Sequence, residues 1–170
     1  MMSARVALLK NESGNAAVEM ALSIPMLFAL MFGAFELGSY FYAEHKVVKA
    51  VRDGARFASR QPFSEYPSCA PSTAVVDNTR NVTRTGRVTG GAPRLTYWSN
   101  PATISVTAAC FTTNADSSVT YGGIYSGRSD GAPVVTVAAA VPYTPILGQL
   151  GLLSATLTLN ARSQAAVNGI

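Results

Sequence analysis

The chain has 170 residues, of which 48% are hydrophobic and only 13% are charged. Soluble domains usually contain about a quarter of charged residues, so this composition favours a membrane segment or an exported domain with few charges. The net charge is +4, but the positive residues are scattered and no basic patch is interleaved with aromatic residues, which argues against nucleic-acid binding. The length allows one modest domain and an appended element.

The N-terminal part divides into a short polar leader and a long apolar run. Residues 1–14, MMSARVALLKNESG, carry two positive side chains, and residues 16–35 then contain Glu19 as their only charged residue. This run has the length that a helix needs to cross a hydrocarbon core of about 30 Å. We therefore expect residues 1–14 to be a cytoplasmic leader and residues 16–37 to be the transmembrane part of a helix.

Three kinds of membrane signal could explain a polar leader followed by a long apolar run. A cleaved secretory signal has an apolar core of roughly 7–15 residues followed by small residues at the cut, whereas here the run is longer and FELGSYFYAEHKVV continues it as good helix-forming sequence. The other two are a plain signal anchor and an anchor whose leader is removed on the cytoplasmic side.

Glu19 bears on this choice, because a carboxylate costs about 2.5–3.5 kcal/mol at the centre of a membrane helix and less near its edge. Glu19 lies near the edge, where it is either solvated at the interface or paired. If the chain were cut after Gly14, the new ammonium group of Asn15 would lie one helical turn from Glu19, or beside Glu19 of a neighbouring subunit. Such an ion pair would offset the desolvation cost.

The stretch GNAAVEMAL resembles the signals of prepilins, in which a glycine precedes the cut and a glutamate follows five positions later. Asn15 replaces the phenylalanine that is usual after the cut in type IV pilins, and the pattern is more similar to the Flp or tight-adherence (Tad) branch. Pro25 early in the apolar run, and then VVKAVRDGARFASR, resemble TadE-like pseudopilins. The resemblance covers residues 12–60.

The resemblance implies cleavage by a prepilin peptidase between Gly14 and Asn15. It implies a structural role as a minor pilin or pseudopilin, whose partners are other pilin subunits and the inner-membrane proteins of pilus assembly. The alternative is an uncleaved single-pass membrane protein that displays a periplasmic binding domain.

We expect one helix over residues 15–60, kinked at Pro25 because proline removes a backbone hydrogen bond. Its second half repeats small apolar residues at three- and four-residue steps, which predicts a face packed on a domain. Gly33, Gly38 and Gly54 offer points of close approach for other helices. The stripe consists of Val47, Val48, Val51, Ala55 and Ala58.

Orientation is a point of conflict. Positive charge is denser after the apolar run than before it, and the positive-inside rule alone would place residues 46–60 in the cytoplasm. We nevertheless expect the N-terminus inside, because the signal is prepilin-like and the region after residue 60 has the Thr/Val/Ala-rich, lysine-free composition of an exported domain. This predicts a bacterial inner-membrane protein with residues 61–170 in the periplasm.

The C-terminal region reads as a small antiparallel β domain. A Pro/Ser-rich break at 61–72 precedes a short helix at 72–85, with Ser72 as its cap and Gly86 as its terminator. Alternating patterns predict strands at 103–111, 134–141 and 154–161, and an edge strand at 95–98. The segment PILGQLGLL reads as a loop or a short helix. The fold class is therefore α+β, with a pilin-like architecture.

The sequence contains few groups that could carry chemistry. Cys69 and Cys110 lie without metal-ligand spacing, and an exported domain would most simply pair them in a disulfide, the alternative being two buried thiols in a reducing compartment. His45 is the only histidine and has no evident catalytic partner. We expect neither an enzyme nor a bound cofactor or metal. The dispersed carboxylates include Glu65, Asp77, Asp116 and Asp130.

Overall fold

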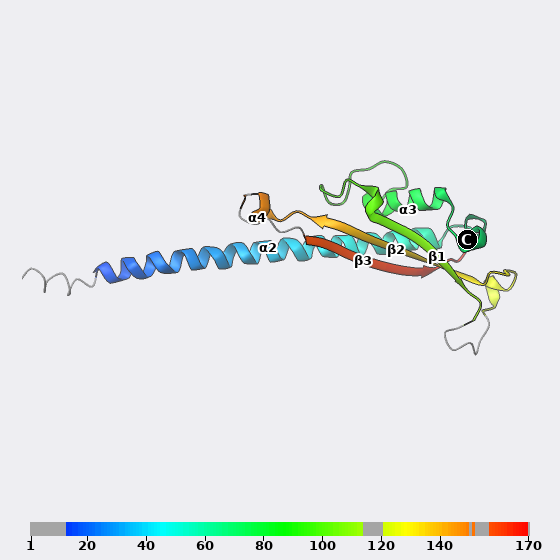
Figure 1. Cartoon of the computed structure of the whole chain (residues 1–170), viewed down its shortest axis with the longest axis horizontal. Helices are drawn as coiled ribbons and strands as arrows, with labels where there is room; N and C mark the ends of the chain where they lie inside the picture. The colour runs from blue at the N-terminus through cyan, green and yellow to red at the C-terminus, as the bar shows by residue number, and fades with distance from the viewer. Residues whose placement is uncertain (1–12, 114–120, 150, 152–156, 170) are drawn as a thin grey trace, which may run out of the picture. The chain divides into compact units, whose positions relative to one another are not determined.

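The computed structural model describes residues 13–113, 121–149, 151 and 157–169. Figure 1 shows the helices α2 (Ser13–Ser59), α3 (Thr73–Thr85) and α4 (Ile146–Gln149) and the strands β1 (Ile104–Phe111), β2 (Ala132–Tyr143) and β3 (Leu157–Ala166). The chain also forms the short 3-10 helices η1 (Phe63–Glu65), η2 (Pro67–Cys69), η3 (Pro101–Thr103) and η4 (Gly123–Tyr125). The chain divides into two compact units, Met1–Ser39 and Tyr40–Ile170. The expected α+β class is confirmed.

Helix α2 contributes residues to both units and contains 47 residues. Pro25 lies inside it, and the kink at this position stays a prediction. Within the second unit, α2 turns a stripe of small apolar side chains to the core. Val48 was expected in this stripe but is only half-buried, because it lies about 100° around the helix from its neighbour Val47. The buried stripe is Ala43, Val47, Ala50, Val51, Ala55 and Ala58.

The sheet is antiparallel, and β2 lies between β1 and β3 (Figure 1). Side chains alternate between the two faces of each strand, so every second residue enters the core. Pairs such as Val106 with Val137 and Val141 with Leu159 stand opposite each other and are buried. These strands and α2 close over one hydrophobic core, which includes Tyr66 and Trp98.

Two expectations for this unit differ from the structure. Residues 95–98 form a turn rather than an edge strand, with the Trp98 amide donating to the carbonyl of Leu95 over 2.9 Å and both side chains buried. The third strand extends five residues beyond the predicted end at residue 161 and reaches Ala166. The expected start of this strand, residues 154–156, lies outside the described residues.

Helix α3 begins and ends where the sequence predicts. The Ser72 hydroxyl accepts a hydrogen bond from the Val75 amide, and Gly86 ends the helix in the left-handed conformation with its amide bonded to Val82. On its packed side, Thr79 and Thr83 are fully buried. A Cβ on Gly54 of α2 would overlap the Thr83 hydroxyl and lie 3.3 Å from Thr83 Cβ. Of the three glycines expected to allow close approach, Gly54 therefore does so within the described chain.

The C-terminal end of α2 has partners for all of its last four carbonyl groups, which a helix cannot satisfy internally. Hydrogen bonds to them come from the helix's own last turn, from the residues that follow it and from the far end of the chain. The donors are Ser59 Oγ to Arg56 (3.0 Å), Gln61 Nε2 to Phe57 (3.0 Å), Tyr66 Oη to Ala58 (2.7 Å) and the Asn168 amide to Ser59 (2.8 Å).

Tyr66 is the most enclosed of these donors, since its side chain is fully buried. Burial, assisted by the negative charge of Glu65, raises the pKa of the Tyr66 phenol to about 12. The buried hydroxyl therefore stays protonated and keeps donating to Ala58 at pH values at which a tyrosine in an unfolded chain ionises.

The contact between α2 and α3 predicts the effect of Gly54→Ala. The added methyl group displaces Thr83, which donates to the Thr79 carbonyl over 2.7 Å, and overpacking of this kind costs about 1–3 kcal/mol. We expect a net loss of stability in thermal unfolding followed by circular dichroism, although alanine favours helix formation. Gly38→Ala is the matched control, because no atom lies within 4 Å of a Cβ at Gly38. An equally large loss for both variants would contradict the packing role of Gly54.

Because the Tyr66 hydroxyl donates to the carbonyl of Ala58, we expect Tyr66→Phe to lower the free energy of unfolding by about 1–2 kcal/mol. This bond also predicts a pH dependence. The folded pKa of about 12 lies above the unfolded value of 10.0, so the contribution of Tyr66 is complete below pH 10 and is lost as the pH rises towards 12. Denaturant unfolding between pH 9 and pH 11.5 should give a steeper fall for the wild type than for Tyr66→Phe. Tyr121→Phe, which changes an exposed tyrosine, should leave the wild-type slope unchanged.

Candidate functional site

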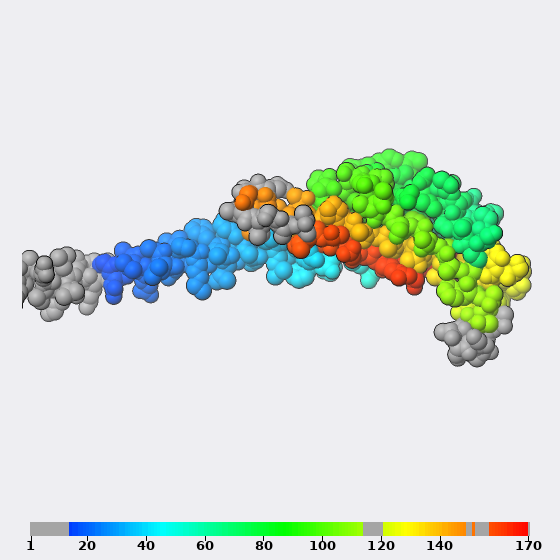
Figure 2. All heavy atoms as spheres, viewed as in Figure 1, coloured from blue at the N-terminus to red at the C-terminus, as the bar shows by residue number. Residues whose placement is uncertain are grey.

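The described part of the first unit, residues 13–39 of α2, exposes its large apolar side chains. Consecutive residues such as Met26, Leu27 and Phe28 are all exposed, and because neighbours on a helix lie about 100° apart, the apolar surface surrounds the helix. A helix that is apolar all round is buried in a protein or in a membrane. Figure 2 shows this segment in blue. The exposed side chains are Val18, Met20, Leu22, Ile24, Met26, Leu27, Phe28, Leu30, Met31, Phe32, Phe35 and Leu37.

Among the described residues, α2 is the one helix that is long and apolar enough to cross a membrane. Its length and composition therefore agree with a membrane-anchored chain. The transmembrane bounds of 16–37 and the division at residue 60 stay predictions.

Gly14 and Asn15 lie in the first turn of α2, and both are exposed. The amide groups of a first helical turn have no acceptor within the helix. Glu19 follows Asn15 by four residues, so the two side chains share one helix face, and Glu19 is also exposed. The three residues that the sequence singled out thus lie within two turns of one exposed helix end.

The candidate chemical groups do not come together in the described residues. His45 lies exposed on α2. Three carboxylates have their own partners: Glu65 accepts from the Ser72 hydroxyl, Asp77 pairs with Arg80 at 3.5 Å, and Asp130 pairs with Arg128 at 3.6 Å. Asp116 lies outside the described residues. No group of three or more metal-ligating side chains is present in the part that the structure describes.

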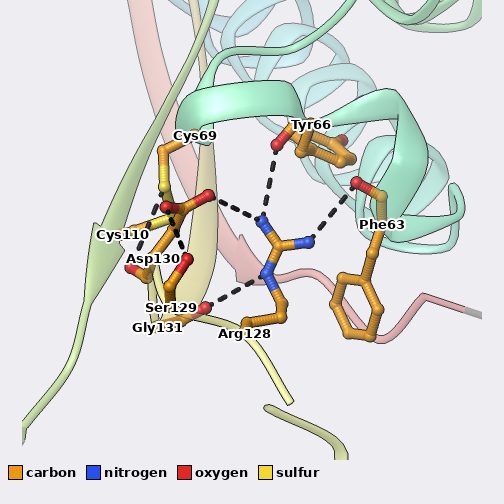
Figure 3. Close-up of polar contacts among 8 residues, drawn as sticks. All are labelled: Phe63, Tyr66, Cys69, Cys110, Arg128, Ser129, Asp130 and Gly131. Carbon is orange, nitrogen blue, oxygen red and sulfur yellow. Dashed lines mark hydrogen bonds and ion pairs between the residues drawn. A yellow bond between two sulfur atoms is a disulfide. The ribbon is translucent and has the colours of Figure 1, made fainter.

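Cys69 and Cys110 form a disulfide that joins η2 to β1 (Figure 3). Their Cα atoms are 5.7 Å apart, and 41 residues separate them in the sequence. This bond agrees with the pairing favoured by the sequence. Ser68 and Cys69 adopt left-handed conformations with φ of 50° and 62°, which costs a residue with a side chain roughly 1–2 kcal/mol.

Arg128 donates hydrogen bonds to main-chain carbonyls of the residues that precede η2 (Figure 3). Its guanidinium lies 5.0 Å from the centre of the Phe63 ring and donates to the carbonyls of Phe63 and Tyr66 at 3.5 Å and of Gly131 at 3.3 Å. Arg128 and the disulfide thus fix the residues between the end of α2 and α3. This role of Arg128 could not be predicted from the sequence, because its partners are mostly main-chain carbonyls, which no side-chain pattern reveals.

Comparison with known proteins identifies the N-terminal segment. Residues 14–56 match the model of the family described as TadE-like protein, about a quarter of the chain. The resemblance predicted from the sequence is thereby confirmed for this segment, which begins at Gly14 and contains Glu19 and most of α2. The TadE-like family is a structural pilin family, and the expectation that this chain is not an enzyme stays a prediction. No curated protein and no solved structure matches the chain.

The disulfide predicts a stability difference between oxidised and reduced protein. Closing a loop of this length restricts the unfolded chain and stabilises the fold by about 2–4 kcal/mol. We expect the double variant C69S/C110S to unfold at a correspondingly lower denaturant concentration. Wild-type protein treated with dithiothreitol should unfold at the same denaturant concentration as the double variant. The reductant should not change the unfolding midpoint of the variant. A wild-type midpoint that does not respond to reduction would contradict the bond.

Proposed function

We propose, from the match of residues 14–56 to the TadE-like family, that this chain is a minor pilin or pseudopilin of a Flp-type adherence pilus. It would be made with the leader of residues 1–14, cut by a prepilin peptidase between Gly14 and Asn15, and then used as a structural subunit in pilus assembly. The observation that carries the proposal is the exposed helix start in which Gly14, Asn15 and Glu19 precede an all-round apolar helix.

Each part of this segment then has a physical task. Gly14 presents a backbone without a side chain, with no atom within 4 Å of the place of a Cβ, so a peptidase can approach it closely. The cut leaves Asn15 with an ammonium group one turn from Glu19. The apolar surface holds the subunit in the membrane, and pairing of Glu19 with an ammonium group, its own or a neighbour's, offsets the cost of placing its charge in the bilayer.

The same proposal implies where the protein lies in the cell and which proteins contact it. The chain sits in the bacterial inner membrane with its N-terminus in the cytoplasm and the unit Tyr40–Ile170 outside, where an oxidising compartment maintains the Cys69–Cys110 disulfide. Other pilin subunits and the inner-membrane assembly proteins contact the apolar segment. The positive-inside rule opposes this orientation, and the disulfide favours it.

The second candidate function is an uncleaved single-pass membrane protein that displays the unit Tyr40–Ile170 as a binding domain. The exposure of the apolar segment favours it equally, since any anchor has such a surface. The two functions differ in the N-terminus of the working protein and in the need for a carboxylate at position 19.

The N-terminus is tested by mass spectrometry of the protein extracted from its own membrane. We expect a chain that begins at Asn15, and we expect Gly14→Leu to retain residues 1–14 because its side chain blocks the approach of the peptidase. A wild-type protein that keeps the leader would support the second function. Normal cleavage of Gly14→Leu would place the cut elsewhere.

Glu19→Gln separates pairing from anchoring, because it keeps the shape of the side chain and removes its charge. We expect normal membrane insertion and cleavage but at least about tenfold less incorporation into the pilus machinery, which corresponds to about 1.4 kcal/mol of lost pairing. Co-purification with pilus subunits measures this incorporation. Glu44→Gln, in the second unit, is the matched control and should assemble normally. Equal assembly of both variants would leave Glu19 without a pairing role.

A further inference from the structure

Four basic residues of α2 form one exposed row within the second unit. His45, Lys49, Arg52 and Arg56 follow each other at intervals of four, three and four residues, which places them on one helix face, and all four side chains are exposed. We call these residues the basic row. It lies away from the buried Val/Ala stripe of the same helix and extends over about 16 Å at 1.5 Å per residue.

The basic row has no counter-charge of its own. None of its four side chains makes a hydrogen bond or an ion pair with the residues that the structure describes. Asp53, which follows Arg52 on α2, pairs with Arg94, whose guanidinium lies 2.8 Å from the Asp53 carboxylate. Like charges one helical turn apart destabilise a helix, so a row without partners is unfavourable in the isolated subunit.

The row borders a groove on α2 that a partner can enter. The groove has a volume of about 400 Å³ and is lined by the basic row, Val48 and Asp53. Val48 is the half-buried residue that does not face the core. Its position gives the groove a small apolar floor between cations, the combination that suits an amphipathic helix whose acidic residues border an apolar stripe.

A second copy of α2 does not supply this complement. The carboxylates of α2 are Glu19, Glu36, Glu44 and Asp53, and their intervals of 17, 8 and 9 residues never place two of them one turn apart. Two basic rows would repel each other. The face therefore opposes pairing with itself and favours a different chain.

A nucleic acid fits this face less well than a protein helix. Nucleic-acid surfaces combine cations with aromatic side chains for stacking or with donors that converge on phosphates. The groove instead has cations along one line and an aliphatic residue at its floor.

We infer that the basic row docks a helix of a different protein that carries carboxylates at successive turns. This goes beyond the proposed function, because the row is a separate surface from the apolar segment and its binding requires neither cleavage of the leader nor a pilus. In an assembly, such a surface makes contacts between unlike subunits favourable and contacts between like subunits unfavourable.

The test uses the full chain purified in dodecyl maltoside and a synthetic helical peptide whose glutamates recur at intervals of four, three and four residues. A peptide of the same composition, with the glutamates distributed around the helix, is the control probe. We expect the row peptide to bind at least about tenfold more tightly than the control peptide, and added salt to weaken this binding.

Two charge-matched variants locate the binding site. R52E/R56E should lower the affinity for the row peptide by at least about tenfold, whereas R87E/R162E, which changes two exposed arginines elsewhere, should lower it less than about twofold. R52Q/R56Q removes the row's charges without reversing them and should fall between these two variants. Circular dichroism checks that each variant is folded.

If R52E/R56E and R87E/R162E lower the affinity equally, or if the two peptides bind equally well, the inference is overturned, because the net charge of the protein alone would then explain the binding. Stronger, row-dependent binding to phosphatidylglycerol vesicles or to a DNA duplex than to the row peptide would overturn it too. Self-association of the wild type that R52E/R56E abolishes would also overturn it. These results are independent of the N-terminal mass, which tests the proposed function.

Discussion

The α-helical hydrogen bonds of α2 are the constraint from which the other features follow. A helix satisfies its main-chain groups internally, so its side chains alone decide which surroundings it tolerates. Up to about residue 37 these side chains are apolar on every side, and in the second unit they are apolar on one side only. One helix therefore suits an apolar environment in its first part and a protein core in its second part.

The internal pattern ends at Ser59, and the surrounding chain supplies what the helix no longer can. The last carbonyl groups of α2 receive donors from the following turn, from Tyr66 and from Asn168. Arg128 and the disulfide hold the segment that contains Tyr66. The loop connections of this unit thus lie around one helix end, where the half-buried Arg128 bonds to their main-chain carbonyls.

The sequence predicted the features that depend on periodicity and on local turn chemistry. The apolar run, the Val/Ala stripe, the cap at Ser72 and the three strands all follow from patterns within a few residues. The edge strand at 95–98 was wrong because LTYW has the composition of a strand, and only the tertiary position of Trp98 decides for a turn. The end of β3 was missed because Ala161, Ser163 and Ala165 are small and half-buried, so their alternation gives a weak signal.

The candidate site divides in the same way. Gly14 and Glu19 are candidates because of their spacing, and the residues 14–56 that match the TadE-like family include both of them. The basic row was not predicted, since its lysine and its arginines were considered only as positive charge that follows the apolar run, and a common helix face shows only when their spacing is compared. Tyr66 and Arg128 act through main-chain carbonyls from distant segments, and no sequence pattern reports such contacts.

The bond from Asn168 to Ser59 also has a consequence for the time course of folding. Residues 59 and 168 belong to opposite ends of the second unit, and Val167 is buried beside β2, with its amide bonded to Pro133 over 2.9 Å. In the orientation proposed above, the chain crosses the membrane from its N-terminus onwards, so Val167 and Asn168 follow the other core residues of the second unit. Until they arrive, the carbonyl of Ser59 lacks the amide of Asn168 and the core lacks the side chain of Val167, so in this proposal the unit completes its core only at the end of translocation.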